Sequence, residues 1–389
     1  MPGIWHTPAV RRAPLVLWLL GACAEPEGSS PDVLADTSSA APAPWPSPCV
    51  RAQPLTADGQ RLQGAMAYTK RVGAESWVIT PVRGATLVAG EQVVGATDDR
   101  GCFDVPLLDG IRAEARAALS HFDVTVVSDA GAWSWPVAGV DVLVDEPYAA
   151  GAFNALEGAV RVDLSLGALD PDLRGAPLQI RWGEAVRPAC GSCFYFDGFT
   201  LELTGQPGDE DAHDDPVLLH ELGHYVEAAF GTWSNPGGGH DLEPAAPAMA
   251  WSEGFATWFQ AWLRGQPDYT DLQPSRIYQL DLEATPLIVN GVVPEGDPSG
   301  RLSEGLVYGL LWDLFDERLE DDDGQSTDGD GLFRAAVGVL GHPPGSVADA
   351  GAPGADLLDF LRRLACGSSV SVSAVTESFG FPWSSSLCP

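Results

Sequence analysis

Two histidines four positions apart, with a glutamate directly after the first, constrain this chain more than any other feature. Residues 220–224 read HELGH, so the three residues are His220, Glu221 and His224. Residues four apart lie on one face of an α-helix, and both imidazoles can therefore reach one metal ion. Two histidines at this spacing are typical zinc ligands, and the glutamate between them can act on a water at the metal. Because the whole chain has only seven histidines, the pattern favours a metal-binding helix over a helix with two incidental histidines.

The residues around this segment also predict a helix. Asp215 is the expected N-cap and Pro216 the first helical residue, since both residue types favour those positions. Gly223 should let another element pack closely between the histidines, and Gly231 should end the helix. A buried stripe is predicted for the apolar residues that recur at helical spacing, which are Leu219, Leu222, Val226 and Ala229.

A catalytic zinc site uses three protein ligands and keeps one position open. Glu253 is the best candidate for the third ligand, because it follows His224 by 29 residues in a second predicted helix. This helix is expected over residues 248–263 and is closed by Gly265. The alternative for Glu253 is a solvated carboxylate on the surface of that helix.

Segments 220–224 and 251–256, which read HELGH and WSEGFA, together resemble the gluzincins, the thermolysin-like zinc peptidases. In those proteins the third ligand is a glutamate on a helix downstream of the HExxH pattern. The resemblance implies that His220, His224 and Glu253 hold Zn²⁺ and that Glu221 is the general base. The thermolysin pattern also has an aspartate four residues after the ligand glutamate, which braces a zinc-binding histidine. Thr257 stands at that position here, so we expect either its hydroxyl or a group from elsewhere to be the brace.

Two further residues are candidates for stabilising the oxyanion of such a reaction. His240 lies in a glycine-rich loop sixteen residues after His224. It is also the rival third ligand, although the metzincin pattern needs a histidine six residues after the second. Tyr308 lies in a third predicted helix, over residues 303–315, and some gluzincins use a tyrosine in this role. The alternatives are a surface histidine and a core tyrosine.

Residues 49–146 are predicted to form an all-β module, because they contain strand-like runs such as 124–127 and 140–144 and no long helical period. Residues 81–88 read PVRGATLV and residues 97–103 read TDDRGCF. These two segments resemble the carboxypeptidase regulatory-like, transthyretin-like β-sandwich. The resemblance covers about seventy residues and implies a small sandwich with no chemistry of its own.

The first 48 residues are typical of an exported chain. Within residues 1–23, Arg11 and Arg12 precede an apolar run that is too short to span a membrane. Residues 20–23, LGAC, resemble a lipobox, which implies cleavage before Cys23 and a lipid on its thiol. Residues 24–48 are rich in Ala, Pro and Ser and are predicted to be a disordered tether. We therefore expect a lipoprotein anchored to the bacterial cell envelope, at the outer membrane, with an ordinary secretory signal as the alternative.

Six cysteines remain after Cys23, and an even number in an exported chain suggests disulfides. Proximity in sequence favours the pairs Cys366–Cys388 and Cys190–Cys193, which leaves Cys49–Cys102 by elimination. Residues 190–193, CGSC, could instead be a redox motif or half of a zinc site. A small structural loop is the preferred interpretation, because no second CxxC pair is present.

The formal net charge of −33, from 54 acidic and 21 basic residues, argues against a nucleic-acid partner, because the chain would repel phosphates. Two acidic stretches, residues 209–215 and 321–331, could offer oxygen ligands to Ca²⁺. Neither stretch matches the EF-hand spacing, so solvated acidic loops are the alternative.

These features predict a multidomain chain, with an N-terminal all-β sandwich over residues 49–146. A mainly α (α+β), zincin-like metallopeptidase domain is predicted over residues 147–389. The predicted activity is zinc-dependent endoproteolysis of protein or peptide substrates by metal-activated water, with Glu221 as general base. Two alternatives stay open: a surface-binding lipoprotein whose zinc site is structural or inactive, and a metal hydrolase that acts on a non-peptide bond.

Overall fold

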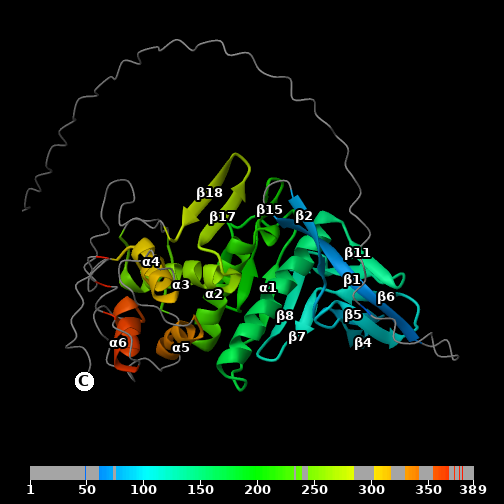
Figure 1. The fold of residues 1–389 in the computed structure, drawn as a ribbon. Helices are drawn as coiled ribbons and strands as arrows, with labels where there is room; N and C mark the ends of the chain where they lie inside the picture. The colour runs from blue at the N-terminus through cyan, green and yellow to red at the C-terminus, as the bar shows by residue number, and fades with distance from the viewer. Residues whose placement is uncertain are drawn as a thin grey trace, which may run out of the picture. The chain divides into compact units, whose positions relative to one another are not determined.

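Strands dominate the first part of the computed structural model, and helices dominate the second part (Figure 1). This order agrees with the predicted succession of a β-rich and a helix-rich region. The residues that the structure describes are 49, 61–72, 76–231, 234–238, 244–283, 302–316, 329–340 and 354–367, with 372, 376 and 379. All of them belong to one compact unit, residues 46–389. The expected export signal and tether lie outside the described residues.

Two four-stranded sheets make up most of the strand-rich region. In the first sheet the strand order is β11-β1-β2, with β5 also paired to β1. Its strands are β1 (Arg61–Val72), β2 (Ser76–Pro81), β5 (Cys102–Pro106) and β11 (Asp141–Val144). The second sheet has the order β10-β6-β3-β4. Its strands are β3 (Thr86–Ala89), β4 (Gln92–Ala96), β6 (Ile111–Glu114) and β10 (Ser134–Pro136). The identity of this region as a transthyretin-like sandwich stays a prediction.

The expected turn in residues 97–103 is present. Oδ1 of Asp98 accepts hydrogen bonds from the backbone N–H groups of Arg100, at 2.9 Å, and Cys102, at 2.8 Å. Gly101 adopts a φ of 74°, a left-handed conformation that favours glycine. The aspartate and the glycine of the motif therefore build the connection that leads into β5.

A third sheet joins strands from both sides of residue 146. Its order is β13-β14-β12-β8-β7, with β9 paired to β8, and β12 runs parallel to both β8 and β14. The strands are β7 (Arg116–Ala118), β8 (Asp123–Ser128), β9 (Gly131–Ala132), β12 (Leu178–Arg181), β13 (Cys193–Tyr195) and β14 (Thr200–Glu202). The expected domain boundary between residues 146 and 147 stays a prediction, and the hydrogen bonds of this sheet cross it.

Helix α1 (Pro147–Leu169) connects the two halves of the third sheet, and it was not foreseen from the sequence. Glu146 caps it by accepting hydrogen bonds from the backbone N–H groups of Tyr148 and Ala149. The helix packs against both β8 and α2. Near its middle, Nδ2 of Asn154 donates to the carbonyl of Ala212, at 2.8 Å, and to Oδ1 of Asp215, at 3.1 Å. Helix α1 therefore fixes the place where α2 begins.

Three helices carry the predicted site, and they lie close to their predicted positions. They are α2 (Asp215–Phe230), α3 (Pro247–Arg264) and α4 (Glu304–Phe315). The prediction of Asp215 as N-cap was wrong by one residue, because Asp214 is the N-cap and Asp215 is already helical. The carboxylate of Asp215 is instead engaged by Lys70 and Arg161. Gly265 ends α3 in a left-handed conformation, as expected.

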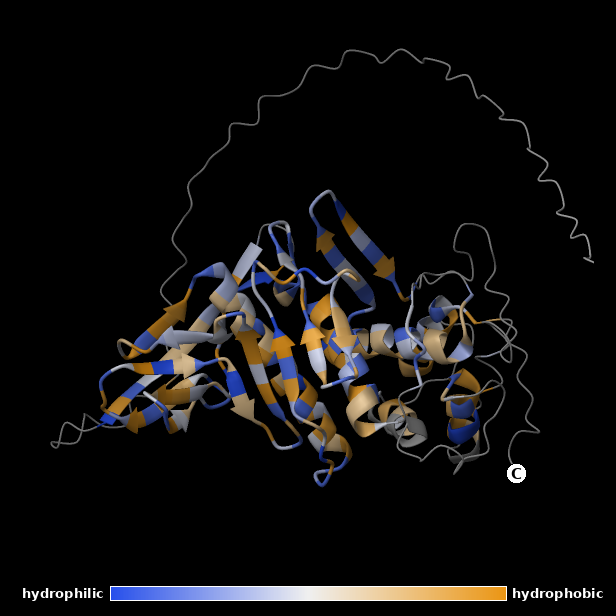
Figure 2. Ribbon diagram, turned by 180° about the vertical axis from the view of Figure 1, so that it is seen from behind, coloured by the Kyte–Doolittle hydropathy of each residue, from blue (hydrophilic) through white to orange (hydrophobic). Residues whose placement is uncertain are grey.

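The shorter elements complete the fold around these helices. They are β15 (Gly205–Gln206), β16 (Asp209–Glu210), the 3-10 helix η1 (Asp211–His213), α5 (Gly329–Leu340) and α6 (Leu357–Gly367). After α3, the strands β17 (Asp268–Gln273) and β18 (Arg276–Asp281) form an antiparallel hairpin. Figure 2 shows hydrophilic and hydrophobic bands alternating along this hairpin, as the period of two in a strand requires.

Two of the expected disulfides are formed, Cys49–Cys102 and Cys190–Cys193. The expected pair Cys366–Cys388 falls outside the described residues, because Cys388 is not among them. Among the described residues, no helix has both the length and the apolar character that crossing a membrane requires.

The contact between α3 and α4 depends on Gly254. A Cβ at this position would overlap the side chain of Val307 and lie 2.9 Å from the backbone oxygen of Glu304. We expect Gly254→Ala to lower the free energy of unfolding by about 1–3 kcal/mol, because α4 must shift to admit the methyl group. The midpoint of urea unfolding measures this change. Gly139→Ala is the control, because nothing lies within 4 Å of a Cβ there; equal midpoints for the two variants would contradict the prediction.

Candidate metal centre

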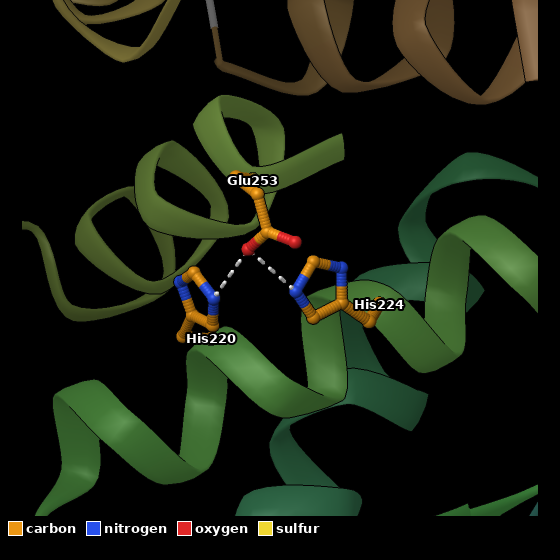
Figure 3. A group of neighbouring side chains, drawn as sticks. All are labelled: His220, His224 and Glu253. Carbon is orange, nitrogen blue, oxygen red and sulfur yellow. Dashed lines mark hydrogen bonds and ion pairs between the residues drawn. The ribbon is translucent and has the colours of Figure 1, made fainter. Parts of the chain in front are cut away.

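The side chains of His220, His224 and Glu253 converge on one point between α2 and α3 (Figure 3). Nε2 of His224 lies 3.1 Å from Oε2 of Glu253, and Nε2 of His220 lies 3.4 Å from the same oxygen. The two imidazole rings are 4.8 Å apart between centroids and nearly perpendicular, at 88°. All three residues are buried, so bulk water competes little for these donor atoms.

The spacing of the three donor atoms fits a tetrahedral metal ion. Zinc binds nitrogen and oxygen ligands at about 2.0–2.1 Å, and the edges of such a tetrahedron are about 3.3 Å long. The two distances to Oε2 of Glu253, 3.1 and 3.4 Å, are close to this length. Two imidazoles and one carboxylate are also a known donor set of catalytic zinc sites. The residues present therefore fit the expected ion.

A hydroxyl braces the first histidine, as the sequence allowed. Oγ1 of Thr257 lies 3.1 Å from Nδ1 of His220. A histidine that binds metal through Nε2 carries its hydrogen on Nδ1, and the threonine oxygen can accept that hydrogen. Thr257 thus takes the place where the thermolysin pattern has an aspartate.

The second histidine has a brace that the sequence analysis did not identify. Oγ of Ser252 lies 3.2 Å from Nδ1 of His224 and also donates a hydrogen bond to Oε2 of Glu227. Because the single hydroxyl hydrogen points to the carboxylate, the serine oxygen is left to accept the Nδ1 hydrogen of His224. Asn235 in turn donates to Oε1 of Glu253, at 3.0 Å. The only signal in the sequence was position: Ser252 adjoins Glu253, and Glu227 lies one turn after His224.

In the candidate metal centre, neighbouring charges shift the pKa values of His224 and Glu253 in the direction opposite to the effect of burial. Burial alone would lower the pKa of His224, but Glu253 and Glu227 hold that pKa well above its usual value before a metal ion binds. Burial alone would raise the pKa of Glu253, but the two histidines hold it well below its usual range. Apart from burial, the attraction between the imidazoles and the Glu253 carboxylate is the main cause of both shifts.

A cavity of about 220 Å³ reaches one of the three donor residues, His220. Its lining includes His220, Glu221 and Thr257, together with Tyr269 of the β17–β18 hairpin. The rings of His220 and Tyr269 are 5.8 Å apart between centroids, in an edge-to-face arrangement. Glu221 itself is only 7 % exposed, and it is part of the lining of this cavity.

The two predicted oxyanion donors have different outcomes. Tyr308 is 2 % exposed within α4 and belongs to the hydrophobic core. It is not among the described residues that line the cavity. His240 lies outside the described residues. Their roles in catalysis stay predictions, as do those of the other candidate residues.

The structure describes the first of the two acidic stretches, residues 209–215, but little of the second, residues 321–331. Asp209 and Asp211, from the first stretch, meet Asp271 of β17, with one oxygen from each lying within 4.8 Å of the others. Nearly all of the second stretch lies outside the described residues.

Comparison with known proteins supports one relationship. Residues 170–337 match the family model of the mycolysin C-terminal domain. This segment covers His220, Glu221, His224 and Glu253. The match supports a relationship to the thermolysin-like metallopeptidases, a family that implies zinc. No curated protein matches the chain.

The brace on His220 can be tested by changing Thr257. Thr257→Val keeps the shape of the side chain but removes the hydroxyl, so we expect zinc affinity to fall about 10- to 100-fold. Thr257→Ser keeps the oxygen and should stay close to the parent. Competition with a chelator of known zinc affinity measures the change at matched protein fold. If valine and serine variants retain zinc equally, the hydroxyl does not act as a brace.

Proposed function

We propose that this protein is a zinc-dependent endopeptidase. The observation that carries the proposal is the convergence of His220, His224 and Glu253, together with a cavity that both His220 and Glu221 line. The match of residues 170–337 to the mycolysin C-terminal domain supports the same activity. Protein or peptide chains are the proposed substrates.

Each side chain has a defined task in this proposal. His220, His224 and Glu253 would hold Zn²⁺, which when bound polarises the scissile carbonyl and acidifies a water. Glu221 takes a proton from the attacking water and later gives it to the leaving amine. Its burial keeps the carboxylate out of bulk water, so the proton it accepts remains next to the reacting atoms. Thr257 and Ser252 orient the two imidazoles.

Stabilisation of the oxyanion has three candidates. Tyr308 and His240 come from the sequence analysis, and we add Tyr269 because it lines the cavity next to His220. Burial, and the nearby Asp271 and Glu221, hold the pKa of Tyr269 well above its usual value. Its hydroxyl therefore keeps its hydrogen at neutral pH and can donate it to a developing negative charge.

The main alternative is a surface-binding protein with a structural or inactive zinc site. A structural zinc site is closed by four protein ligands. The described residues offer three donors in this group, and a cavity reaches one of them, His220, which favours the catalytic interpretation. The other alternative, a metal hydrolase that acts on a non-peptide bond, can be distinguished from a peptidase only by identifying the substrate.

The decisive variant is Glu221→Gln. Because Glu221 is not one of the three converging donors, zinc content and thermal stability should be unchanged. Loss of the proton acceptor should lower the rate of cleavage of an unfolded protein at least about 10²- to 10⁴-fold. Rates are compared at equal zinc content per chain.

Two results would count against the proposal. Equal cleavage by the parent and Glu221→Gln would exclude Glu221 as the base. No cleavage by either protein would favour the surface-binding alternative.

We also propose that the chain is a lipoprotein of the bacterial envelope, anchored through Cys23. The support is the LGAC sequence at residues 20–23 and the Pro/Ala/Ser-rich stretch after it. Labelled fatty acid should be incorporated in a bacterial host and lost in Cys23→Ser. A mature N-terminus other than Cys23, found by mass spectrometry, would refute this proposal.

A further inference from the structure

The β17–β18 hairpin presents different residues to its two faces. Side chains alternate along a strand, and Tyr269, Asp271 and Gln273 of β17 all line the cavity next to the metal centre. Tyr278 and Leu280 of β18 lie on the same face. The intervening residues of β17 face a separate cavity on the other side, and these are Asp268, Thr270 and Leu272. One wall of the cavity beside the metal centre is therefore built by a single hairpin face.

Three carboxylates gather in this cavity. Asp209, Asp211 and Asp271 each place one oxygen within 4.8 Å of the others, and all three line the cavity. No lysine or arginine is among the described residues of its lining, whereas Glu221 and Glu304 are. The nearby cations Lys70 and Arg71 instead line the separate cavity, where they pair with Asp215 and Asp214. The negative charge of the three carboxylates is therefore not neutralised by a cation within the described lining.

Each of the three carboxylates accepts a side-chain hydrogen bond through one oxygen, and in two of them the other oxygen has no partner. Oδ2 of Asp209 accepts from Gln206, Oδ2 of Asp211 accepts from Ser192, and Oδ2 of Asp271 accepts from Gln273. Oδ1 of Asp211 is buried without a hydrogen-bond partner, and so is Oδ1 of Asp271. Asp211 is only 3 % exposed. An unpaired buried carboxylate oxygen is costly, so its persistence points to a ligand that supplies hydrogens.

The charge state of Asp211 agrees with this view. Burial raises its pKa well above the usual value, and the neighbouring Asp271 and Asp209 add to the shift. Without a cation, repulsion between the carboxylates and loss of solvation both disfavour ionised Asp211. A bound cation would relieve both effects.

We propose that these three carboxylates bind a primary ammonium group of the substrate, the side chain of lysine in particular. An ammonium has three hydrogens to donate and accepts none, and three carboxylates surround this place. Charge-assisted N–H···O bonds are about 2.7–2.9 Å long, which puts three acceptors around one nitrogen about 4.6 Å apart. One oxygen of each carboxylate lies within 4.8 Å of the others, so a single ammonium nitrogen can lie within hydrogen-bond distance of all three. The inference rests on the proposed peptidase function for its biological meaning, but the ammonium site can be tested separately.

The walls of the cavity fit the rest of a lysine side chain. Tyr269, Tyr278 and Leu280 offer aromatic and apolar surface against which a methylene chain can pack. Tyr269 contacts the ring of His220, and Asp271 lies two residues further along the same strand, roughly 6.6 Å by the rise of a β-strand. A side chain that leaves the peptide backbone near the metal centre can therefore extend toward the carboxylates.

A calcium ion fits this group less well. Ca²⁺ takes six to eight oxygen ligands, whereas one oxygen of each aspartate is already engaged by Gln206, Ser192 or Gln273. The apolar wall formed by Tyr278 and Leu280 supplies no oxygen from a carboxylate or amide side chain. Calcium binding is therefore the competing outcome in the test below.

The first experiment measures binding and does not depend on proteolysis. The full chain is titrated with n-butylammonium, which mimics the end of a lysine side chain, and with tetramethylammonium, which has the charge but no N–H group. We expect saturable calorimetric binding of n-butylammonium only, weakened about 10- to 100-fold in Asp271→Asn. Asp268→Asn is the matched control, because Asp268 lies on the same strand and faces the other cavity. Its affinity should equal that of the parent.

The second experiment identifies the source of the ammonium group. The parent is given an unfolded protein of known sequence, and its cleavage sites are mapped by mass spectrometry. Peptides spanning a site are then made with lysine or acetyl-lysine, each with a free or an acetylated N-terminus. We expect cleavage to fall about 10- to 100-fold on acetylation of the side chain, and this difference to shrink in Asp271→Asn but not in Asp268→Asn.

The outcomes separate this inference from the proposed function. Dependence on the free N-terminus instead of the side chain would keep the ammonium site but assign it to the α-amine. Cleavage that ignores both modifications would overturn the inference and leave the peptidase intact. If nothing is cleaved, the proposed function fails. The n-butylammonium titration still shows whether the ammonium site exists. Equal responses of the parent and Asp271→Asn, or stoichiometric Ca²⁺ binding in place of n-butylammonium, would overturn the ammonium site.

Discussion

The close approach of α2 and α3 is the contact on which the candidate site depends. At its centre, a Cβ on Gly223 would lie 3.0 Å from Cα of Ala256 and 3.2 Å from its Cβ. Because both residues are small, the helices come close enough for Glu253, one turn before Ala256, to meet Nε2 of both histidines. A larger side chain at either position would separate the helices and lengthen those distances. The geometry of the candidate metal centre is therefore set by two residues outside the group of three.

The parts of the site that could be predicted are those with a local pattern. The HExxH spacing and the glutamate helix pointed to three residues that do converge, and the small residue at Gly223 indicated a close neighbour, which is Ala256. Thr257 was foreseen as one of two possibilities for the brace. The link from His224 through Ser252 to Glu227 was missed, because each contact joins two helices and no periodicity reports it. Tyr269 and Asp271 were missed for the same reason, since they reach the cavity only through the fold of a hairpin.

The fold shows a similar division between local and distant information. Helices α2, α3 and α4 were predicted within a residue or two at their ends, because proline, serine, glycine and apolar spacing act within a few turns. The start of α2 differed by one residue, and the carboxylate of Asp215 pairs with Lys70 and Arg161, which lie far away in the sequence. The pairing of β8 with β12 could not be read from either segment. Both segments are short runs rich in apolar residues, and nothing in either sequence specifies which strand it pairs with.

The third sheet has a consequence for the order in which the chain acquires structure. Strand β8 ends at Ser128 and its parallel partner β12 begins at Leu178, with all of α1 between them. Pairing over such a long connection is slow, because chain entropy is lost before the contact forms. Until β12 arrives, the edge of β8 that it covers has unpaired backbone groups, which are prone to join another chain. In a chain that emerges from its N-terminus, β8 is made before β12 and before α2, so this edge is exposed before the helix that carries His220 and His224 has been made.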